Sequence, residues 1–372
     1  MFQLANAIPV SRIGLGCGRL GLDSENVGSI EREIEALRFG IQKGLNFIDT
    51  AEVYADGRSE FIVGKAIEGV RHQVFVASKF SPENADHGNV IKSLENSLKR
   101  LNTDYLDLYQ IHWPNPKIPI IDTLNALKEL KSQGKILNVG VSNFSKREMK
   151  QAQEAMPELG LISNQVELNL VDRFTEEQLL PYCKDTNTTL IAYSPLDKGR
   201  NAQGDPRFQK IQELAAKYGK TTTQIALNWL ISKNNVLPIP ASANPKHLLE
   251  NLESAAFELE KKDILEIDQT FATNPKYIPI DMIEVSLKGE GMKKVYQTLE
   301  EALRNELNLV PSPRELALHI SEGDPIKPVR LVEAKFGRSD RKYDLVEGRL
   351  RYWAWVIAFE GKKPIPAYVR YA

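Results

Sequence analysis

The sequence has few of the residues that hold disulfide frameworks and metal centres. Only Cys17 and Cys183 are cysteines among 372 residues, and histidine occurs five times. There is no CxxC pair and no cluster of cysteine and histidine, so we expect neither a disulfide-stabilised fold nor a metal site.

Long apolar runs and an excess of one charge sign are also lacking. No stretch of about 18 apolar residues is available to cross a bilayer. The first residues, MFQLANAIPVSRIGLG, lack the basic and apolar segments of a secretory signal. We therefore expect no membrane contact and a cytoplasmic protein. The net charge of -1 says nothing about the partners of the chain as a whole.

The composition that is present is that of an ordinary globular protein. Hydrophobic residues make up 42% of the chain and charged residues 26%, which is enough apolar surface for a sizeable core. The length exceeds the roughly 250 residues that are typical of a (β/α)8 barrel. A barrel followed by a smaller domain is therefore the expected organisation.

Short apolar and β-branched runs alternate with segments of helical periodicity as far as about residue 255, which is the pattern of parallel βα units. The eight runs are residues 13–16, 46–49, 74–78, 108–112, 137–142, 162–167, 189–194 and 236–240. In the first helical segment Ile30, Ile34, Leu37 and Ile41 share one face, and Gly44 ends the helix. The sequence predicts an α/β fold of the (β/α)8, or TIM-barrel, type. An open doubly wound sheet is the alternative, but no GxGxxG motif follows an early strand.

The alternation of apolar runs and helical segments ends near residue 255. The stretch TNPKY at 273–277 indicates a linker near 273–279, so we expect domains at 1–274 and 275–372. The second domain has a strand-like segment IPIDMIEV at 278–285, then two helical stretches, further strand-like runs and an aromatic helix. It is predicted to be a small α+β domain.

Four polar residues follow the predicted strands where the loops of a barrel converge over its mouth. Asp49 ends the second strand, Tyr54 lies in the same loop, Lys79 ends the third strand and His112 ends the fourth. Each alone has a structural interpretation: a helix cap, a core aromatic, a solvated strand end and a core histidine. All four at one rim favour a catalytic site.

These residue types suit the reduction of a carbonyl by hydride. Negative charge develops on the carbonyl oxygen, and a phenol is a poor proton donor at neutral pH unless its pKa is lowered. We expect the Lys79 ammonium to lower the pKa of Tyr54, and Asp49 to hold Lys79 charged and oriented. His112 is expected to donate a hydrogen bond that places the carbonyl oxygen. No metal is needed.

The segments FIDTAEVY, VASKF and QIHWP resemble the signature segments of the aldo-keto reductase superfamily, and the resemblance covers about residues 8–257. It implies an NAD(P)H-dependent oxidoreductase that reduces an aldehyde or ketone to an alcohol, with Asp49, Tyr54, Lys79 and His112 as catalytic tetrad and Tyr54 as general acid. It also places Trp113 in the wall of the substrate pocket; the structural alternative is a packing residue at the rim.

The same resemblance implies a set of residues that bind the cofactor. Ser142, Asn143 and Gln165 match residues that hold the nicotinamide carboxamide, Tyr193 matches the aromatic that stacks on its ring, and Ser194 and Leu196 match contacts to the pyrophosphate. The structural alternative for GVSNF is a strand end that caps the next helix.

The predicted adenosine segment, LPIPASANPKHLLENLE, departs from the family pattern. Ser242, Glu250 and Asn251 match it. Ala241 and His247 stand where Lys and Arg commonly clamp the 2'-phosphate, with Lys246 beside His247 as a substitute cation. Because such a clamp is a charge-assisted contact, its loss narrows the advantage of NADPH. We predict NADP(H) or NAD(H) as cofactor, with the preference left open.

The segment YDLVEGRLRYWAWVIAFEGKKPIPAYVRY resembles the ParB/sulfiredoxin-like fold, over about residues 278–372. The resemblance implies a nucleotide phosphate site at Gly348, Arg349 and Arg351, at a helix N-terminus. Arg349 stands where the sulfiredoxins carry their catalytic cysteine, which excludes sulfinic acid repair. Leu350 stands where Arg or His is usual. The structural alternative is a β-to-α turn with solvated arginines.

Two functions remain open at this point. One is an active reductase with a fused accessory domain. The other is a cofactor-binding regulatory or redox-sensing protein whose C-terminal domain recognises a nucleotide or a partner. Nucleic acid is not expected, because acidic residues interleave with the basic ones between residues 327 and 347.

Overall fold

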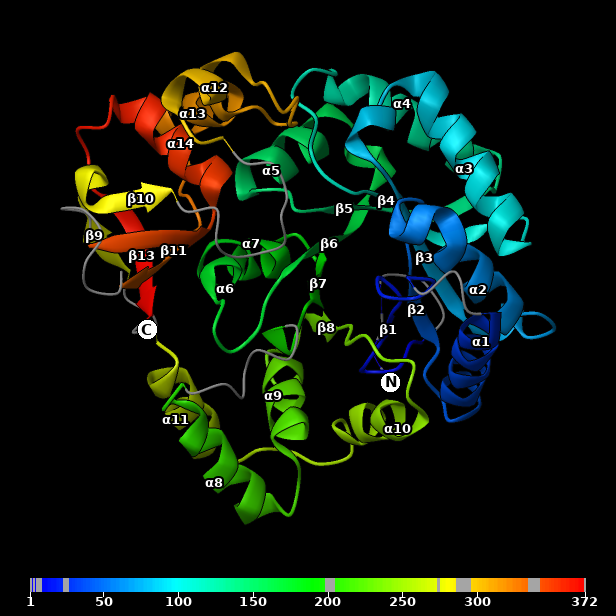
Figure 1. Ribbon diagram of the computed structural model, residues 1–372. Helices are drawn as coiled ribbons and strands as arrows, with labels where there is room; N and C mark the ends of the chain where they lie inside the picture. The colour runs from blue at the N-terminus through cyan, green and yellow to red at the C-terminus, as the bar shows by residue number, and fades with distance from the viewer. Residues whose placement is uncertain are drawn as a thin grey trace. The chain divides into compact units, whose positions relative to one another are not determined.

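The computed structural model describes two units (Figure 1). Contacts divide the chain into Met1–Phe271 and Ala272–Ala372. The residues described are 2, 4, 9–22, 27–197, 205–272, 275–285, 296–333 and 342–370. No helix within these ranges is long and apolar enough to cross a membrane.

Eight parallel strands pair in chain order in the first unit. They are β1 (Leu15–Gly16), β2 (Phe47–Asp49), β3 (Phe75–Phe80), β4 (Leu106–Ile111), β5 (Ile136–Ser142), β6 (Leu161–Glu167), β7 (Thr189–Tyr193) and β8 (Val236–Pro238). The backbone N–H groups of Gly14 and Gly16 donate to the carbonyl oxygens of Pro238 and Pro240 at 2.9 and 3.1 Å. These bonds close the sheet, so the predicted eight-stranded barrel is confirmed.

Helices follow the strands and surround the barrel (Figure 1). They are α1 (Val27–Gln42), α2 (Arg58–Ala66), α3 (His87–Leu101), α4 (Ile120–Ser132), α5 (Lys146–Ala155), α6 (Phe174–Gln178), α7 (Leu180–Asp185), α8 (Phe208–Tyr218), α9 (Thr222–Ile231), α10 (Pro245–Glu253) and α11 (Lys261–Thr270). Local sequence sets several ends. Ser145 with Glu148 and Thr221 with Gln224 form capping boxes at α5 and α9. Gly44 follows α1 with a φ of 103°, a conformation that glycine adopts without steric cost.

Alternation along the strands decides which side chains reach the barrel interior. On β3, Phe75 and Ala77 belong to the interior cluster, whereas Val76 packs in the cluster between strands and helices. Because side chains alternate along a strand, Lys79 faces the barrel interior on the same side as Phe75 and Ala77. On β2, Phe47 faces inward in the same way and Asp49 continues its series. Apolar inward residues therefore fill the barrel, and Asp49 and Lys79 lie above them at the carboxyl ends.

The second unit contains a mixed five-stranded sheet in the order β10-β12-β11-β13-β9. Its elements are β9 (Lys276–Ile278), β10 (Ile283–Val285), α12 (Leu299–Arg304), α13 (Pro313–Ser321), β11 (Val329–Glu333), β12 (Tyr343–Glu347), α14 (Arg349–Phe359) and β13 (Ile365–Arg370). α14 supplies the buried aromatics: Trp353 Nε1 donates to the Tyr296 carbonyl at 2.8 Å and Trp355 Nε1 to that of Lys363 at 3.0 Å. An α+β unit is thus present, as predicted.

Two details of the predicted boundary region were wrong. Lys276–Ile278, expected within a linker, pairs with β13 as strand β9. The strand expected over residues 278–285 is interrupted by a 3-10 helix at Ile280–Met282 and resumes only as β10. Pro279 precedes that turn and cannot donate to a sheet, which explains the interruption. Residues 273, 274 and 334–341 lie outside the described part of the chain.

Candidate active site

Lys79 is the centre of the predicted tetrad, and its side chain has no exposed surface. Its ammonium donates to Asp49 Oδ2 at 2.8 Å, to the Thr50 carbonyl at 2.9 Å and to the Tyr54 hydroxyl at 3.3 Å. An ammonium has three protons, so these three acceptors satisfy it completely. The structure therefore joins Asp49, Lys79 and Tyr54 into one hydrogen-bonded unit.

Tyr54 projects from a tight turn after β2. Ala55 and Asp56, the next two residues, have φ values of 49° and 54°, and Gly57 follows at 84°. The Tyr54 ring meets the His112 ring edge-on, with centroids 5.6 Å apart. Because Lys79 donates to the Tyr54 oxygen, the hydroxyl proton of Tyr54 is directed elsewhere.

Burial changes the expected acidity of Tyr54. It raises the pKa of the phenol, and the charge and hydrogen bond of Lys79 lower it only in part, so the net shift is upward. The predicted lowering effect of Lys79 on the Tyr54 pKa is present, but burial, which was not part of the prediction, outweighs it. Burial by itself would lower the pKa of Lys79. The charges and hydrogen bonds of Asp49 and Tyr54 outweigh burial, so the pKa of Lys79 is raised.

His112 lies half-buried beside Tyr54. Burial, with the Lys79 charge as a second cause, lowers its pKa from 6.5 to about 3. The ring is therefore neutral at ordinary pH, and one of its nitrogens carries a proton that can be donated, although which one depends on the tautomer.

This shift makes the stability of the protein depend on pH. A histidine whose pKa is lowered by folding contributes stability above pH 6.5, and that contribution is lost as the pH falls toward 3. We expect His112→Gln to lose less stability than wild type between pH 7 and pH 5, by about 1–2 kcal/mol. Urea unfolding at both pH values measures the difference. His72→Gln, at an exposed position, is the control; an equal loss in His112→Gln and wild type would contradict the expectation.

The residues predicted to hold the carboxamide lie together at the ends of β5, β6 and β7. Asn143 donates to Ser142 Oγ at 3.0 Å and to the His112 carbonyl at 3.1 Å, and it accepts from the Tyr193 hydroxyl at 3.0 Å. Ser142 Oγ donates to the Gln165 carbonyl at 2.8 Å. Gln165 Nε2 in turn donates to Asp49 Oδ1 at 2.7 Å. A continuous chain of hydrogen bonds thus connects this group to the tetrad.

The remaining predicted cofactor residues follow β7 and β8. Ser194 has a φ of 48°, and Leu196 is half-buried against the outer core. Ser242 Oγ accepts from the Asn244 N–H at 3.1 Å before α10 begins. Three predicted residues lie on α10. His247 is exposed and Asn251 is buried, and Glu250 accepts a hydrogen bond from Thr221 Oγ1 at 2.5 Å. Ala241 and Lys246 are exposed as well.

Trp113 follows His112 directly and keeps 44% of its surface exposed. A large apolar ring with that exposure is not a packing residue of the core, and its position after β4 places it at the barrel mouth.

Two contributors to the site were not predicted from the sequence. The Thr50 carbonyl takes one of the three Lys79 protons, and its only sequence signal is its place after Asp49. Glu52 ties the loop after β2 to the loop after β3, because its Oε1 accepts from the Ser81 N–H at 2.7 Å and from Asn84 Nδ2 at 2.9 Å. Within the described ranges, no group of three or more His, Cys, Asp or Glu residues is arranged to hold a metal ion.

The predicted phosphate site of the second unit lies at the start of α14. Gly348 precedes the helix with a φ of 93° and no side-chain cap. Arg351 donates to the carbonyl oxygens of Lys327 at 2.7 Å and Pro328 at 3.3 Å, and its Nη2 lies 3.9 Å from Glu347 Oε1. Arg349 donates to the Val346 carbonyl at 3.4 Å. The two arginines are engaged with the protein itself.

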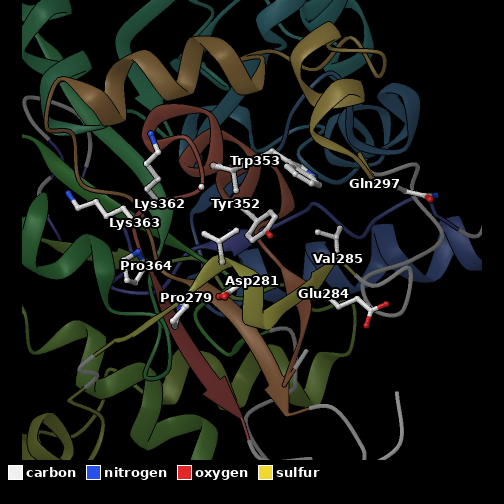
Figure 2. Close-up of a pocket in the computed structure, with 13 residues that line it drawn as sticks. Pro279, Asp281, Glu284, Val285, Gln297, Tyr352, Trp353, Lys362, Lys363 and Pro364 are labelled. Atoms are coloured by element: carbon white, nitrogen blue, oxygen red, sulfur yellow. The ribbon is translucent and has the colours of Figure 1, made fainter. Parts of the chain in front are cut away.

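A cavity of about 740 Å³ lies elsewhere in the second unit. Figure 2 shows Tyr352 and Trp353 of α14 on its wall, with Asp281 near the start of β10 and Lys362 after α14. The residues predicted to bind phosphate are not among those that line it. The cavity and the predicted phosphate site are therefore different places.

Known proteins resemble the first unit. The sequence model of the Aldo/keto reductase family matches residues 12–271. Methylglyoxal reductase YeaE of Escherichia coli is 35% identical over 284 residues, which are 76% of this chain and 99% of the relative. Glyoxal reductase of Bacillus subtilis is 32% identical and matches 72% of this chain and 91% of the relative.

Solved structures of aldo-keto reductases are also similar to this chain. The thermostable aldo-keto reductase Tm1743 has a TM-score of 0.68 at 37% identity, covering 72% of this chain and 98% of that one. An aldo/keto reductase of Klebsiella pneumoniae, solved with NADP and acetate, has a TM-score of 0.66 at 36% identity, covering 72% and 93%. The chain therefore belongs to the aldo/keto reductase family and is an NAD(P)H-dependent carbonyl reductase.

Proposed function

We propose that the reductase uses Tyr54 as the general acid that protonates the carbonyl oxygen. The supporting observation is the Lys79 ammonium, which donates to the Tyr54 oxygen at 3.3 Å while Asp49 and the Thr50 carbonyl hold its other two protons. This arrangement stabilises the phenolate that forms when Tyr54 gives up its proton. The hydroxyl proton of Tyr54 therefore points away from Lys79. His112 lies beside Tyr54, and its neutral ring supplies a second hydrogen-bond donor to the carbonyl oxygen of the substrate.

Ser142, Asn143, Gln165 and Tyr193 are proposed to hold the nicotinamide end of the cofactor. Their amide and hydroxyl groups form one connected cluster, which suits a carboxamide that must both donate and accept. When bound, the cofactor supplies the hydride. The proposed contacts of its remaining parts are Ser194, Leu196, Ser242, His247, Glu250 and Asn251.

The substrate is proposed to be a small reactive aldehyde. Two relatives are named methylglyoxal reductase and glyoxal reductase, and the exposed Trp113 ring offers an apolar wall beside His112. The full chain should oxidise NADPH when methylglyoxal is added, with saturation in both ligands. Absence of turnover with methylglyoxal, glyoxal and a reactive aromatic aldehyde would contradict the proposal.

Discrimination between the two cofactors should be modest. Ala241 carries no charge. The side chains of Lys246 and His247 are exposed and lack the fixed geometry of an arginine clamp. We expect NADPH to be favoured over NADH by less than about a hundredfold, since one lost charge-assisted contact is worth about 1.5–3 kcal/mol. Competitive binding of the two reduced cofactors measures the ratio; a larger preference for NADPH would refute this expectation.

For the second unit, we propose a ParB/sulfiredoxin-like domain that binds a nucleotide phosphate at Gly348, Arg349 and Arg351. The start of α14 supports it, because Gly348 offers no side-chain cap and the backbone N–H groups at a helix start favour an anion. ATP or CTP should then raise the melting temperature of the full chain, and Arg351→Ala should abolish the rise. No shift of the melting temperature with either nucleotide would contradict this proposal.

A further inference from the structure

Gln165 connects the proposed nicotinamide site to the proton-transfer residues. Its carbonyl oxygen accepts from Ser142 Oγ at 2.8 Å and from the Asn143 N–H at 2.9 Å, which fixes its backbone at the end of β6. Its side-chain Nε2 reaches across the barrel to Asp49 Oδ1 at 2.7 Å. Both side chains are buried, with Gln165 and Asp49 each 2% exposed, so water does not compete for this bond.

Asp49 receives one donor on each carboxylate oxygen. Lys79 Nζ donates to Oδ2 at 2.8 Å and Gln165 Nε2 to Oδ1 at 2.7 Å. Among the described residues these are the two donors to the Asp49 side chain. Two donors on opposite oxygens fix the plane of the carboxylate, whereas a single donor would leave it free to rotate about the Cβ–Cγ bond.

We propose that Gln165 is a positioning residue for proton transfer, which holds Asp49 so that Lys79 stays within reach of the Tyr54 hydroxyl. The proposal rests on the proposed role of Tyr54 as acid. It adds a second task to the expected contact with the carboxamide, and the two tasks are compatible: the amide has two N–H protons and one oxygen, and only one proton is used on Asp49. Because the amide is neutral, it orients the carboxylate without competing with the Lys79 charge.

Loss of the Gln165 donor should weaken Tyr54 as an acid. Lys79 lowers the pKa of Tyr54, against burial, which raises it. If Asp49 rotates, the ammonium moves with it and its contact with the Tyr54 oxygen at 3.3 Å lengthens. The pKa of Tyr54 then rises further. The alkaline limb of the pH profile, where the proton donor is lost, should therefore move to higher pH while turnover at neutral pH falls.

The test compares Gln165→Met with Asn143→Ala in the full chain. Methionine keeps the length of glutamine without a donor, and Asn143 lies in the same proposed nicotinamide site without touching Asp49. With methylglyoxal and saturating NADPH, Gln165→Met should lower kcat at least about tenfold, the cost of one buried hydrogen bond to a charged group, and shift the alkaline limb of kcat/KM upward. Asn143→Ala should weaken NADPH binding, measured by fluorescence quenching, and leave the limb in place.

Gln165→Glu is the second variant and does not depend on how well methionine packs. It places a carboxylate against Asp49, so turnover should fall most above neutral pH and recover in part at low pH, where the new carboxyl is protonated and donates. The proposal is overturned if Gln165→Met changes only the NADPH dissociation constant, or if the alkaline limb stays or moves to lower pH. A failure of the proposed function itself is recognised separately, by a Tyr54→Phe variant that reduces methylglyoxal at the wild-type rate.

Discussion

Tyr54→Phe should lower kcat/KM for an aldehyde by about 10²- to 10⁴-fold, the usual contribution of a positioned proton donor. The substitution removes the single oxygen that receives the Lys79 proton at 3.3 Å and leaves the ring in its edge-on contact with His112. The reaction is followed as NADPH oxidation with methylglyoxal in wild type and variant.

Binding of the cofactor distinguishes loss of the acid from general damage to the site. The residues proposed to hold nicotinamide do not use the Tyr54 hydroxyl, so the NADPH dissociation constant should change by less than about threefold, within 1 kcal/mol. Equal rates in wild type and Tyr54→Phe would remove Tyr54 from the mechanism.

Lys79→Met should be the most damaging single change in the barrel. The side chain is fully buried, and its removal leaves the Asp49 carboxylate buried without its cation, which costs about 3–5 kcal/mol. Activity should fall at least as far as in Tyr54→Phe, because the phenolate loses its only adjacent positive charge among the described contacts. The urea-unfolding midpoint and NADPH oxidation report the two effects.

A double variant, Asp49→Asn with Lys79→Met, separates the two effects. Removing both charges together takes away the uncompensated carboxylate, and the neutral amide introduced at position 49 needs no cation beside it, so most of the lost stability should return. Activity should not return with it. A double variant as active as wild type would show that the ion pair has no role in catalysis. A Lys79→Met chain as stable as wild type would show that it has no role in stability.

The barrel was predictable because its strands are short apolar runs separated by segments of helical period. Each of the eight predicted runs overlaps an observed strand, including β1, which spans only Leu15–Gly16. What the sequence did not indicate is how the barrel closes. That closure uses the backbone N–H groups of Gly14 and Gly16, and a side chain on Gly16 would meet the Ile239 carbonyl at 2.7 Å.

The sequence indicated which residues lie together at the candidate site, but not the energetics of that site. Asp49, Lys79 and Tyr54 form the expected hydrogen bonds, because strand ends bring them to one rim. Burial outweighs the expected lowering of the Tyr54 pKa by Lys79, and burial cannot be seen in a short motif. The Thr50 carbonyl and the Gln165–Asp49 bond escaped prediction for a related reason: one is a backbone atom, and the other joins residues 116 positions apart.

The last residue of the first unit has a practical consequence for shortening the chain. Phe271 is completely buried, and its ring meets that of Phe208 on α8 at 5.2 Å. The family match and the first unit both end at this residue. A cut that removes the second unit must therefore fall after Phe271, since a chain ending before it would leave a hole the size of a phenyl ring, at a cost of about 3–5 kcal/mol. The segment that leads to the second unit therefore starts from a buried aromatic residue, and Phe271 completes the hydrophobic core of the first unit at that point.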